Sequence, residues 1–300
     1  MMPVTVAAPS QAQVWWLAVR TATLAASVAP VLAGTAIAIH GGGARLGAGV
    51  GALVVAVAMQ IGVNFANDYS DFIRGADTPR RVGPLRASSS GVVAPDHVKL
   101  AALGSFAVAG LTGLMLSLTT DWRLLLVGAA CLLAGWLYTG GPRPYGYLGL
   151  GELFVFVFFG LVATAGTVYV ESLRVTPLAL LAGCAMGFLA SAILVLNNLR
   201  DIDTDTAAGK RTLATRIGRA NTRVMLVVLV CAAFAIPIVI LVSQLAGVTI
   251  MLIHFAIPIA AVPVRTAFAS NGGPPLVRAL KGMAVAELAY ALLLTLGLLL

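Results

Sequence analysis

The sequence predicts an all-α polytopic membrane protein, with about nine transmembrane helices around a central cavity. Three observations predict this class. Of the 300 residues, 60% are hydrophobic and only 10% are charged, whereas roughly a quarter of the residues in a soluble domain are charged. A soluble fold of this length has too little interior to cover so much apolar side chain. The apolar residues also form long blocks, which favour helices over an alternating outer-membrane barrel.

The apolar blocks define nine expected spans, each near the roughly 20 residues that a bilayer crossing needs. The boundary between the third and fourth spans falls at 119–121, and that between the seventh and eighth at 243–247. We expect residues 1–300 to form a single transmembrane domain in contact with membrane lipid. The expected spans are 14–39, 46–68, 97–119, 122–139, 150–170, 176–200, 222–243, 246–268 and 277–300.

Basic residues are concentrated on one side of this topology. The chain has 19 Lys and Arg against 11 Asp and Glu. All but Arg45, Arg123 and Arg174 fall in the N-terminal region or around the loops that follow even-numbered spans. The positive-inside rule therefore predicts a cytoplasmic N-terminus, an outside C-terminus and a cavity open to the cytoplasmic side. The same rule accounts for most of the net charge of +8, so we expect no nucleic-acid partner.

A first group of polar residues closes the second span, in the string N-F-A-N-D-Y-S-D. Their spacing of three and four residues places them on one face of a helix. Asp77 is out of phase with this face, so it would join the group only through a loop that turns back at Gly75. The members of the group are Asn64, Asn67, Asp68 and Asp71.

A second group closes the sixth span, in the string N-N-L-R-D-I-D-T-D. Asn197 or Asn198 shares a helical face with the two aspartates Asp201 and Asp205. Asp203 falls on the opposite side, where we expect it to bind water or Arg200.

Both acidic groups end at cytoplasmic exits, so they can face each other at one membrane surface. Carboxylates packed together repel, and a divalent cation removes that repulsion. Mg²⁺ suits carboxylate and amide oxygens, and it keeps water and substrate phosphates as its other ligands. The alternative is that these acids are solvated helix ends balanced by arginines. Two matching groups on one side favour the metal.

Basic residues next to these groups point to a phosphorylated ligand. Arg86, Arg143 and Lys210 lie among glycine-rich turns, and Mg²⁺ with Lys and Arg side chains holds a diphosphate and eases its departure. Arg216, Arg219 and Arg223 are better explained by membrane topology. A diphosphate whose tail lies among lipid-embedded helices is an isoprenoid diphosphate, which is the ligand class we predict.

Two Asn/Asp motifs at the exits of spans two and six resemble the UbiA superfamily of intramembrane aromatic prenyltransferases. Three longer strings resemble the branch of that family that acts on 1,4-dihydroxy-2-naphthoate in menaquinone synthesis. In the wider family the third acid of the first motif comes two residues earlier than Asp77, and this departure matches the naphthoate branch. The strings run from Asn64 to Arg86, from Tyr138 to Glu152 and from Asn197 to Leu213.

The resemblance implies Mg²⁺-dependent transfer of a polyprenyl group from polyprenyl diphosphate to the carboxylate-bearing carbon of 1,4-dihydroxy-2-naphthoate. Loss of CO₂ then gives demethylmenaquinone and pyrophosphate. The expected metal ligands are Asn67, Asp68, Asp71, Asp77, Asp201 and Asp205, of which Asp68, Asp71, Asp201 and Asp205 are the expected catalytic residues. The expected substrate-binding residues are Asn64, Asn67, Arg86, Tyr138, Arg143, Tyr145, Asn197, Asn198 and Lys210. The candidates to face the allylic cation are Tyr138, Tyr145 and Phe65.

Two carboxylates have more than one interpretation. Glu152 opens the fifth span, where the helix dipole favours a carboxylate, and it has either a structural role or a role in binding the acceptor. Glu287 lies near the middle of the last span, where a charge is costly and is usually functional or paired.

Two other functions stay open at this point. One is prenyl transfer to a different aromatic or sugar-phosphate acceptor. The other is transport, which also uses intramembrane acids. Transporters carry paired broken spans in two related halves with an ion site at the midplane. Here the acids lie at the exits of spans and no internal repeat is evident, so the sequence favours the enzyme.

Overall fold

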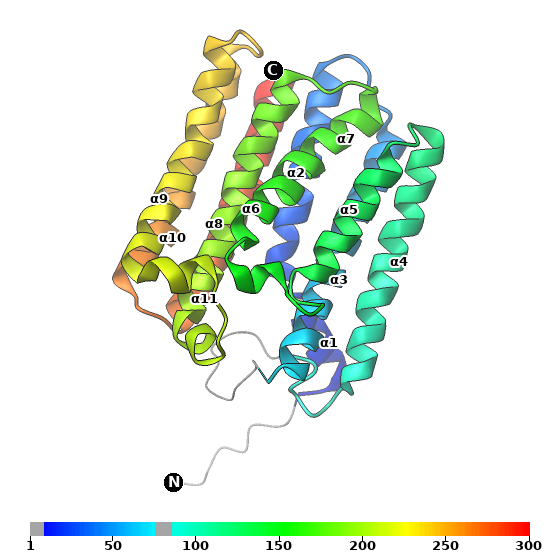
Figure 1. The fold of residues 1–300 in the computed structure, drawn as a ribbon. Helices are drawn as coiled ribbons and strands as arrows, with labels where there is room; N and C mark the ends of the chain where they lie inside the picture. The colour runs from blue at the N-terminus through cyan, green and yellow to red at the C-terminus, as the bar shows by residue number, and fades with distance from the viewer. Residues whose placement is uncertain (1–8, 76–85) are drawn as a thin grey trace.

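The computed structural model describes residues 9–75 and 86–300, and every regular element in these ranges is helical. The long helices lie side by side in one bundle, with α9 and α4 at its opposite edges (Figure 1). This arrangement confirms the predicted class of all-α membrane protein.

The first span consists of two helices joined at Arg20. This residue has a left-handed backbone with φ 55°, which ends the first helix and redirects the second. The next helices follow as an up-and-down series, with α3 packed along α4. The bounds are α1 Gln11–Val19, α2 Thr21–His40, α3 Leu46–Ile73, α4 Pro95–Thr119 and α5 Leu124–Leu137.

The fifth span changes its helical form partway. It begins as α6 (Gly151–Val155), continues as the π-helical segment η2 (Phe156–Val162) and ends as α7 (Ala163–Ser172). A short 3₁₀ turn, η1 (Tyr145–Leu148), precedes it. Such π segments are uncommon and often occur at functional sites.

The remaining helices form the larger part of the core. The helix α8 is the most buried of the spans, with 72% of its apolar stretch inside the protein. It packs against η2 on one side and against α9, α11 and α2 on the others. The bounds are α8 Pro177–Ala207, α9 Leu213–Val242, the 3₁₀ segment η3 Val248–Ala256, α10 Ile257–Ala269 and α11 Pro274–Leu299.

Eight spans in the described part of the chain are long and apolar enough to cross a membrane. The expected fourth span, 122–139, is the exception, because its helix α5 has only 14 residues. A helix of this length rises about 21 Å at 1.5 Å per residue, which is less than the roughly 30 Å of a bilayer core. The other eight expected spans each correspond to one of these helical stretches.

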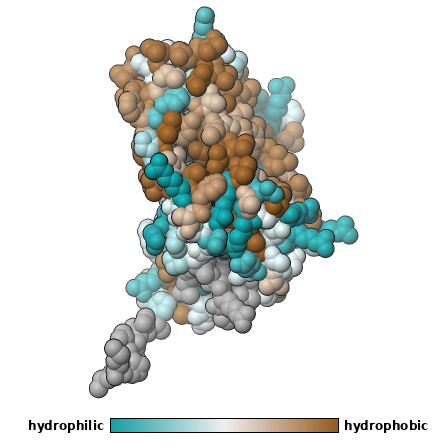
Figure 2. Space-filling view, turned by 90° about the vertical axis from the view of Figure 1, so that its left-hand side faces the viewer, coloured by the Kyte–Doolittle hydropathy of each residue, from teal (hydrophilic) through white to brown (hydrophobic). Residues whose placement is uncertain are grey.

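Apolar side chains cover much of the outer surface, as a lipid-facing protein requires. Leu111, Leu118 and Val228 are examples of exposed apolar residues on the outer helices. Figure 2 shows apolar side chains over the upper body of one face and polar side chains gathered in its lower part. The polar end therefore lies at one end of the helical bundle.

The contact between η2 and α8 depends on glycine. A Cβ atom on Gly160 would lie 2.4 Å from the Cα of Gly187, and a Cβ on Gly187 would lie 2.7 Å from the carbonyl oxygen of Phe156. Small residues let membrane helices approach closely, and this approach replaces the hydrophobic effect as a source of packing energy.

We therefore predict that Gly187→Val destabilises the protein by about 1–3 kcal/mol, the usual cost of overpacking. Thermal unfolding of the detergent-solubilised protein would measure it as a fall in Tm of several degrees. Gly104→Val is the matched control, since no atom lies within 4 Å of a Cβ built there. Equal Tm values for the two variants would contradict the proposed packing constraint.

Candidate active site

Two adjoining cavities lie between the helices. The larger, of about 460 Å³, is lined mainly by apolar side chains, and the smaller, of about 60 Å³, is lined by polar and charged ones. We call them the apolar cavity and the polar pocket. They share four lining residues, so a molecule with a charged head and an apolar tail can occupy both. The shared residues are Arg20, Asn67, Tyr138 and Asn197.

The polar pocket forms where the ends of α3 and α8 meet. Asp71 near the end of α3 accepts from two cations that come from different parts of the chain. Its Oδ2 lies 2.9 Å from Nη2 of Arg86, and its Oδ1 lies 3.0 Å from Nζ of Lys210, which follows α8. Lys210 also lies 3.8 Å from Oδ1 of Asp205. The two acidic groups of the sequence are thus side by side at one end of the bundle.

Tyr147 in η1 completes the surroundings of Asp71. Its hydroxyl donates to Oδ1 of Asp71, and Nζ of Lys210 lies 4.7 Å from the centroid of its ring. Burial, together with the charge of Asp71, raises the pKa of the Tyr147 phenol. Tyr147 is therefore a neutral hydrogen-bond donor to the carboxylate.

The α8 side of the pocket is held by Arg200. Its Nε donates to Oδ1 of Asp201 at 2.7 Å, and its Nη2 lies 2.5 Å from Oδ2 of the same carboxylate. Nη2 also donates to Oδ1 of Asn197 at 2.9 Å. A bidentate pair of this kind fixes both position and direction. Asp201, Asp205 and Asn197 all line the polar pocket.

Two further asparagines line the pocket and have defined partners. Oδ1 of Asn67 accepts from the hydroxyl of Thr139 at 2.6 Å. Nδ2 of Asn198 donates to Oε1 of Glu152 at 2.9 Å. Both amides are therefore held by side chains from outside their own helices.

Asp68 differs from the expected arrangement. Its two oxygens accept from the backbone N–H groups of Ala87 and Ser88, at 2.8 and 2.9 Å. The side chain is buried and is absent from the residues that line the polar pocket. A carboxylate with both oxygens bound in this way anchors the returning chain, which places Arg86 next to Asp71.

Four other expected residues lie away from the polar pocket or outside the described ranges, and one of them, Tyr145, lines only the apolar cavity. Asn64 lines the apolar cavity and donates to the carbonyl oxygen of Val19 at 2.8 Å. Arg143 is exposed and lines neither cavity. Asp77 lies outside the described residues. Asp203 points away as expected, but it pairs with Arg219 at 2.7 Å.

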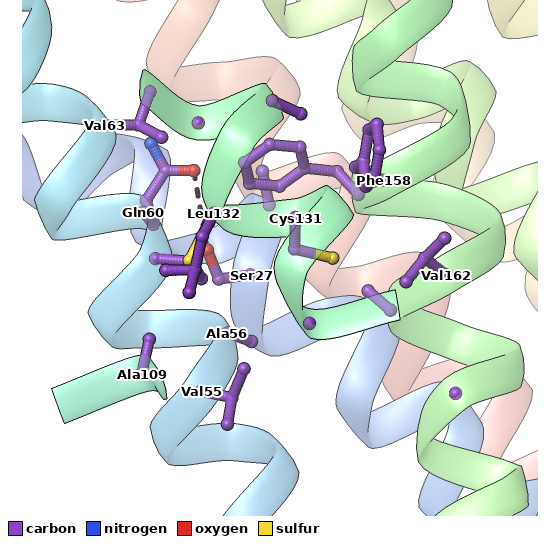
Figure 3. Close-up of a pocket in the computed structure, with 18 of the residues that line it drawn as sticks. Ser27, Val55, Ala56, Gln60, Val63, Ala109, Cys131, Leu132, Phe158 and Val162 are labelled. Atoms are coloured by element: carbon purple, nitrogen blue, oxygen red, sulfur yellow. Dashed lines mark hydrogen bonds between the residues drawn. The ribbon is translucent and has the colours of Figure 1, made fainter. Parts of the chain in front are cut away.

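The apolar cavity is bounded by α2, α3 and α4 on one side and by α5, η2 and α8 on the other. Figure 3 shows Leu132 and Cys131 of α5, Phe158 of η2, and Gln60 of α3 around it. The dashed line in Figure 3 marks the hydrogen bond in which Oγ of Ser27 donates to Oε1 of Gln60, at 3.5 Å. The cavity is therefore apolar with a few polar groups on the α2–α3 wall.

Aromatic rings line the junction of the two cavities. Tyr138 and Tyr145 meet edge to face with centroids 5.5 Å apart, and Tyr145 stacks on Phe154 at 4.0 Å. Burial raises the pKa of both tyrosines, so both phenols are neutral. The electron-rich faces of aromatic rings attract and stabilise a cation that lies over them.

Sequence reasoning missed several lining residues. Arg20 was visible as a lone basic residue in an apolar run, but only the left-handed turn at that position brings it to both cavities. Tyr147 lies within a motif, yet no local pattern predicts its bond to Asp71. The remaining missed residues of the polar pocket are Thr139, Gly146, Thr204 and Thr212.

The polar pocket fits a Mg²⁺ ion that is bound together with phosphate. Its hard donors are the carboxylates of Asp71, Asp201 and Asp205 and the amide oxygens beside them. In the described ranges, no three His, Cys, Asp or Glu side chains converge closely enough to hold a metal alone. Mg²⁺ does not need such a cage, because it is usually bound through one or two carboxylates plus substrate phosphates.

Comparison with known proteins places this architecture among membrane prenyltransferases. The UbiA prenyltransferase family matches residues 27–296. The 1,4-dihydroxy-2-naphthoate octaprenyltransferase of Mycobacterium tuberculosis is 44% identical over 93% of this chain and 94% of its own length. The apo structure of a UbiA homologue from Aeropyrum pernix shares the fold with a TM-score of 0.67 at 14% identity, over 95% of this chain and 98% of that one. A UbiA homologue from Archaeoglobus fulgidus, bound to DMAPP and Mg²⁺, gives a TM-score of 0.62 at 16% identity, over 94% and 99%.

The geometry of Asp68 predicts a structural cost when it is changed. Asp68→Asn leaves one amide oxygen for two N–H donors, and hydrogen bonds to a charged group contribute about 1.5–3 kcal/mol. We expect a clear fall in Tm during thermal unfolding. Asp203→Asn is the control, because the carboxylate of Asp203 is 82% exposed and its ion pair adds little. An unchanged Tm for Asp68→Asn would show that these hydrogen bonds do not hold the segment.

Proposed function

The chain belongs to the UbiA prenyltransferase family, and from this premise we propose that it prenylates 1,4-dihydroxy-2-naphthoate. The polyprenyl group comes from polyprenyl diphosphate, CO₂ is lost from the ring, and pyrophosphate leaves. The product is demethylmenaquinone, formed at the hydroquinone level because the reaction contains no oxidant. The observation that carries the proposal is the shared wall of the two cavities, which suits one ligand with an anionic head and an apolar tail.

The polar pocket is suited to the diphosphate head. Arg86 and Lys210 bring positive charge to Asp71 from two directions, and Arg20 lines the pocket as well. Mixed cations and hard oxygen donors around a small pocket are what a Mg²⁺–diphosphate needs. Of the four carboxylates predicted to be catalytic, Asp71, Asp201 and Asp205 form the proposed catalytic set. Asp68 is a positioning residue, because it anchors the segment that carries Arg86.

The residues that would hold Mg²⁺ are Asp71, Asp201 and Asp205, with the amide oxygens of Asn67 and Asn198 beside them. When bound, the ion neutralises charge that develops on the departing pyrophosphate. Lys210 and Arg86 add positive charge at the same place. Asp77 stays a predicted ligand from the sequence.

The apolar side of the site protects the reacting carbon. The rings of Tyr138, Tyr145 and Phe154 lie where the polar pocket opens into the apolar cavity. Loss of pyrophosphate leaves an allylic cation, which aromatic ring faces stabilise. Water would react with this cation, so the site must exclude water. Neutral phenols serve this role, and the ring hydroxyls of the acceptor already make its carbon nucleophilic.

The choice of acceptor rests on the relatives. A protein named for octaprenyl transfer to 1,4-dihydroxy-2-naphthoate is 44% identical over nearly the whole chain. All residues that line the polar pocket except Arg20 fall inside the three motif strings of the sequence. We therefore prefer this acceptor over a different aromatic or a sugar phosphate.

We propose that the polar pocket faces the cytoplasm and that the N-terminus lies on the same side. The ends of α3 and α8 lie at that end, together with Arg86, Lys210 and Arg219. Arg45 and Arg123 lie at the opposite end, at the starts of α3 and α5. The positive-inside rule gives this orientation.

A turnover assay with purified protein tests the proposed reaction. With labelled polyprenyl diphosphate, 1,4-dihydroxy-2-naphthoate and Mg²⁺, we expect release of pyrophosphate and CO₂ in equal amounts and formation of the prenylated quinol. EDTA should abolish turnover, and added Mg²⁺ should restore it. Turnover with 4-hydroxybenzoate in place of the naphthoate would instead indicate a different acceptor, and no pyrophosphate release with Mg²⁺ present would refute the reaction.

We further predict that Asp71→Asn and Asp201→Asn each lower kcat by at least about 10²–10³-fold, the range seen when a group that stabilises developing charge is removed. The reason is loss of a pocket carboxylate together with its ion pairs to Arg86 and Lys210 or to Arg200. Asp203→Asn should keep wild-type turnover, since Asp203 points away from the pocket. A wild-type rate in either pocket variant, in protein of normal Tm, would exclude that residue from the site.

A further inference from the structure

We propose that Glu152 is a positioning residue, which turns the amide of Asn198 so that its carbonyl oxygen faces the polar pocket. This inference rests on the proposed function, because it assigns the orientation of a group beside the Mg²⁺–diphosphate. Glu152 itself lines neither cavity, so it acts through Asn198.

The side chains of Glu152 and Asn198 contact each other directly. Nδ2 of Asn198 donates to Oε1 of Glu152 at 2.9 Å, and the exposed fractions of the residues are only 6% and 8%. The helix α6 that carries Glu152 is tied to α8 by a second bond, from Oγ of Ser191 to the backbone oxygen of Glu152 at 3.1 Å. The carboxylate is therefore held in place against α8.

This hydrogen bond fixes the orientation of the Asn198 amide. An asparagine has a donor end and an acceptor end, and Oε1 of Glu152 accepts from the donor end of Asn198. The NH₂ end of Asn198 must then face Glu152, which leaves Oδ1 on the side of the polar pocket that Asn198 lines with Asp201 and Asp205. An oxygen at that place attracts a cation, while an NH₂ group would repel it.

The adjacent asparagine is held the other way round. Oδ1 of Asn197 accepts from Nη2 of Arg200 at 2.9 Å, so its NH₂ end is turned toward the cavities that it lines. The neighbours Asn197 and Asn198 therefore present opposite ends, a donor for ligand oxygens and an acceptor for the cation. A cation fixes one orientation and a carboxylate fixes the other.

The carboxylate of Glu152 has few bonds apart from this one. Its Oε2 is buried without a hydrogen-bond partner in the described part of the chain. The preceding residue, Gly151, lies beside Tyr138, since a Cβ built on it would be 3.6 Å from the Tyr138 hydroxyl. The start of α6 therefore borders the side chain that lines both cavities.

A matched control exists in the same span. Glu171 in α7 is also buried, accepts at Oε1 from Thr35 at 2.5 Å and has no partner at Oε2 among the described residues. It lies at the other end of the span, far from the polar pocket, and lines neither cavity. Any general cost of replacing a buried glutamate by glutamine should appear in both variants.

The test measures binding of Mn²⁺ to the full-length protein by electron paramagnetic resonance, in the presence of inorganic pyrophosphate and without prenyl or aromatic substrate. In Glu152→Gln the amide of Asn198 is free to turn over. We expect its Mn²⁺ affinity to fall about 10- to 100-fold, the usual effect of losing a group that orients a ligand. Glu171→Gln should bind Mn²⁺ like the wild type.

An exchange variant separates orientation from charge. Glu152→Gln combined with Asn198→Asp keeps the hydrogen bond, with the amide now at 152, and again directs an oxygen into the pocket. We expect this double variant to regain most of the Mn²⁺ affinity lost in Glu152→Gln. Asn198→Leu should lose as much affinity as Glu152→Gln, and adding Glu152→Gln to it should cause no further loss.

Three results would overturn the inference: equal Mn²⁺ affinity in Glu152→Gln and Glu171→Gln, no recovery in the exchange variant, or a raised KM for the naphthoate with unchanged Mn²⁺ binding. The last result would mean that Glu152 contacts the acceptor. If the wild type itself binds no Mn²⁺ with pyrophosphate, the proposed function fails along with the inference. Wild-type binding with an unaffected Glu152→Gln variant removes the inference alone.

Discussion

The structure depends on one carboxylate that is shared between two cations. Asp71 near the end of α3 accepts from two cations. One is Arg86, which follows α3 in the chain, and the other is Lys210, which follows α8. At 5% exposure of the Asp71 side chain, water screens these ion pairs little, so they are far stronger than surface pairs. Removing one member of such a buried group of ion pairs leaves an uncompensated charge. This requirement keeps the ends of α3 and α8 together and so creates the polar pocket.

The packing of the fifth span sets the shape of the apolar cavity that adjoins the polar pocket. The π-helical segment η2 approaches α8 closely because Gly160, Gly183 and Gly187 have no side chains in the way. Its aromatic residues, together with Tyr138 and Tyr145, then form one wall of the apolar cavity. A rigid contact on the α8 side allows the other side of η2 to border open space. The shape of the apolar cavity is thereby coupled to helix packing.

The polar groups around the pocket are arranged by partners that lie outside it. Arg200 orients Asp201 and Asn197, Glu152 orients Asn198, and the backbone at Ala87 and Ser88 holds Asp68. Each partner binds polar atoms of the side chain and so fixes its orientation. The polar pocket therefore has a preset pattern of charge, which for the proposed diphosphate ligand lowers the cost of reorganisation during the reaction.

The sequence by itself determined the class of the protein and most of the charged and amide residues that line the polar pocket. Apolar block lengths and the spacing of Asn64, Asn67 and Asp71 are local properties, because a helix repeats every 3.6 residues whatever surrounds it. Tertiary structure alone decided the use of each group: that Asp68 faces backbone N–H groups, that Arg143 lies outside the site, that Tyr147 and Arg20 enter it, and that α5 is short. These outcomes depend on contacts between segments up to 139 residues apart, and no local period encodes which partner a buried polar atom will find.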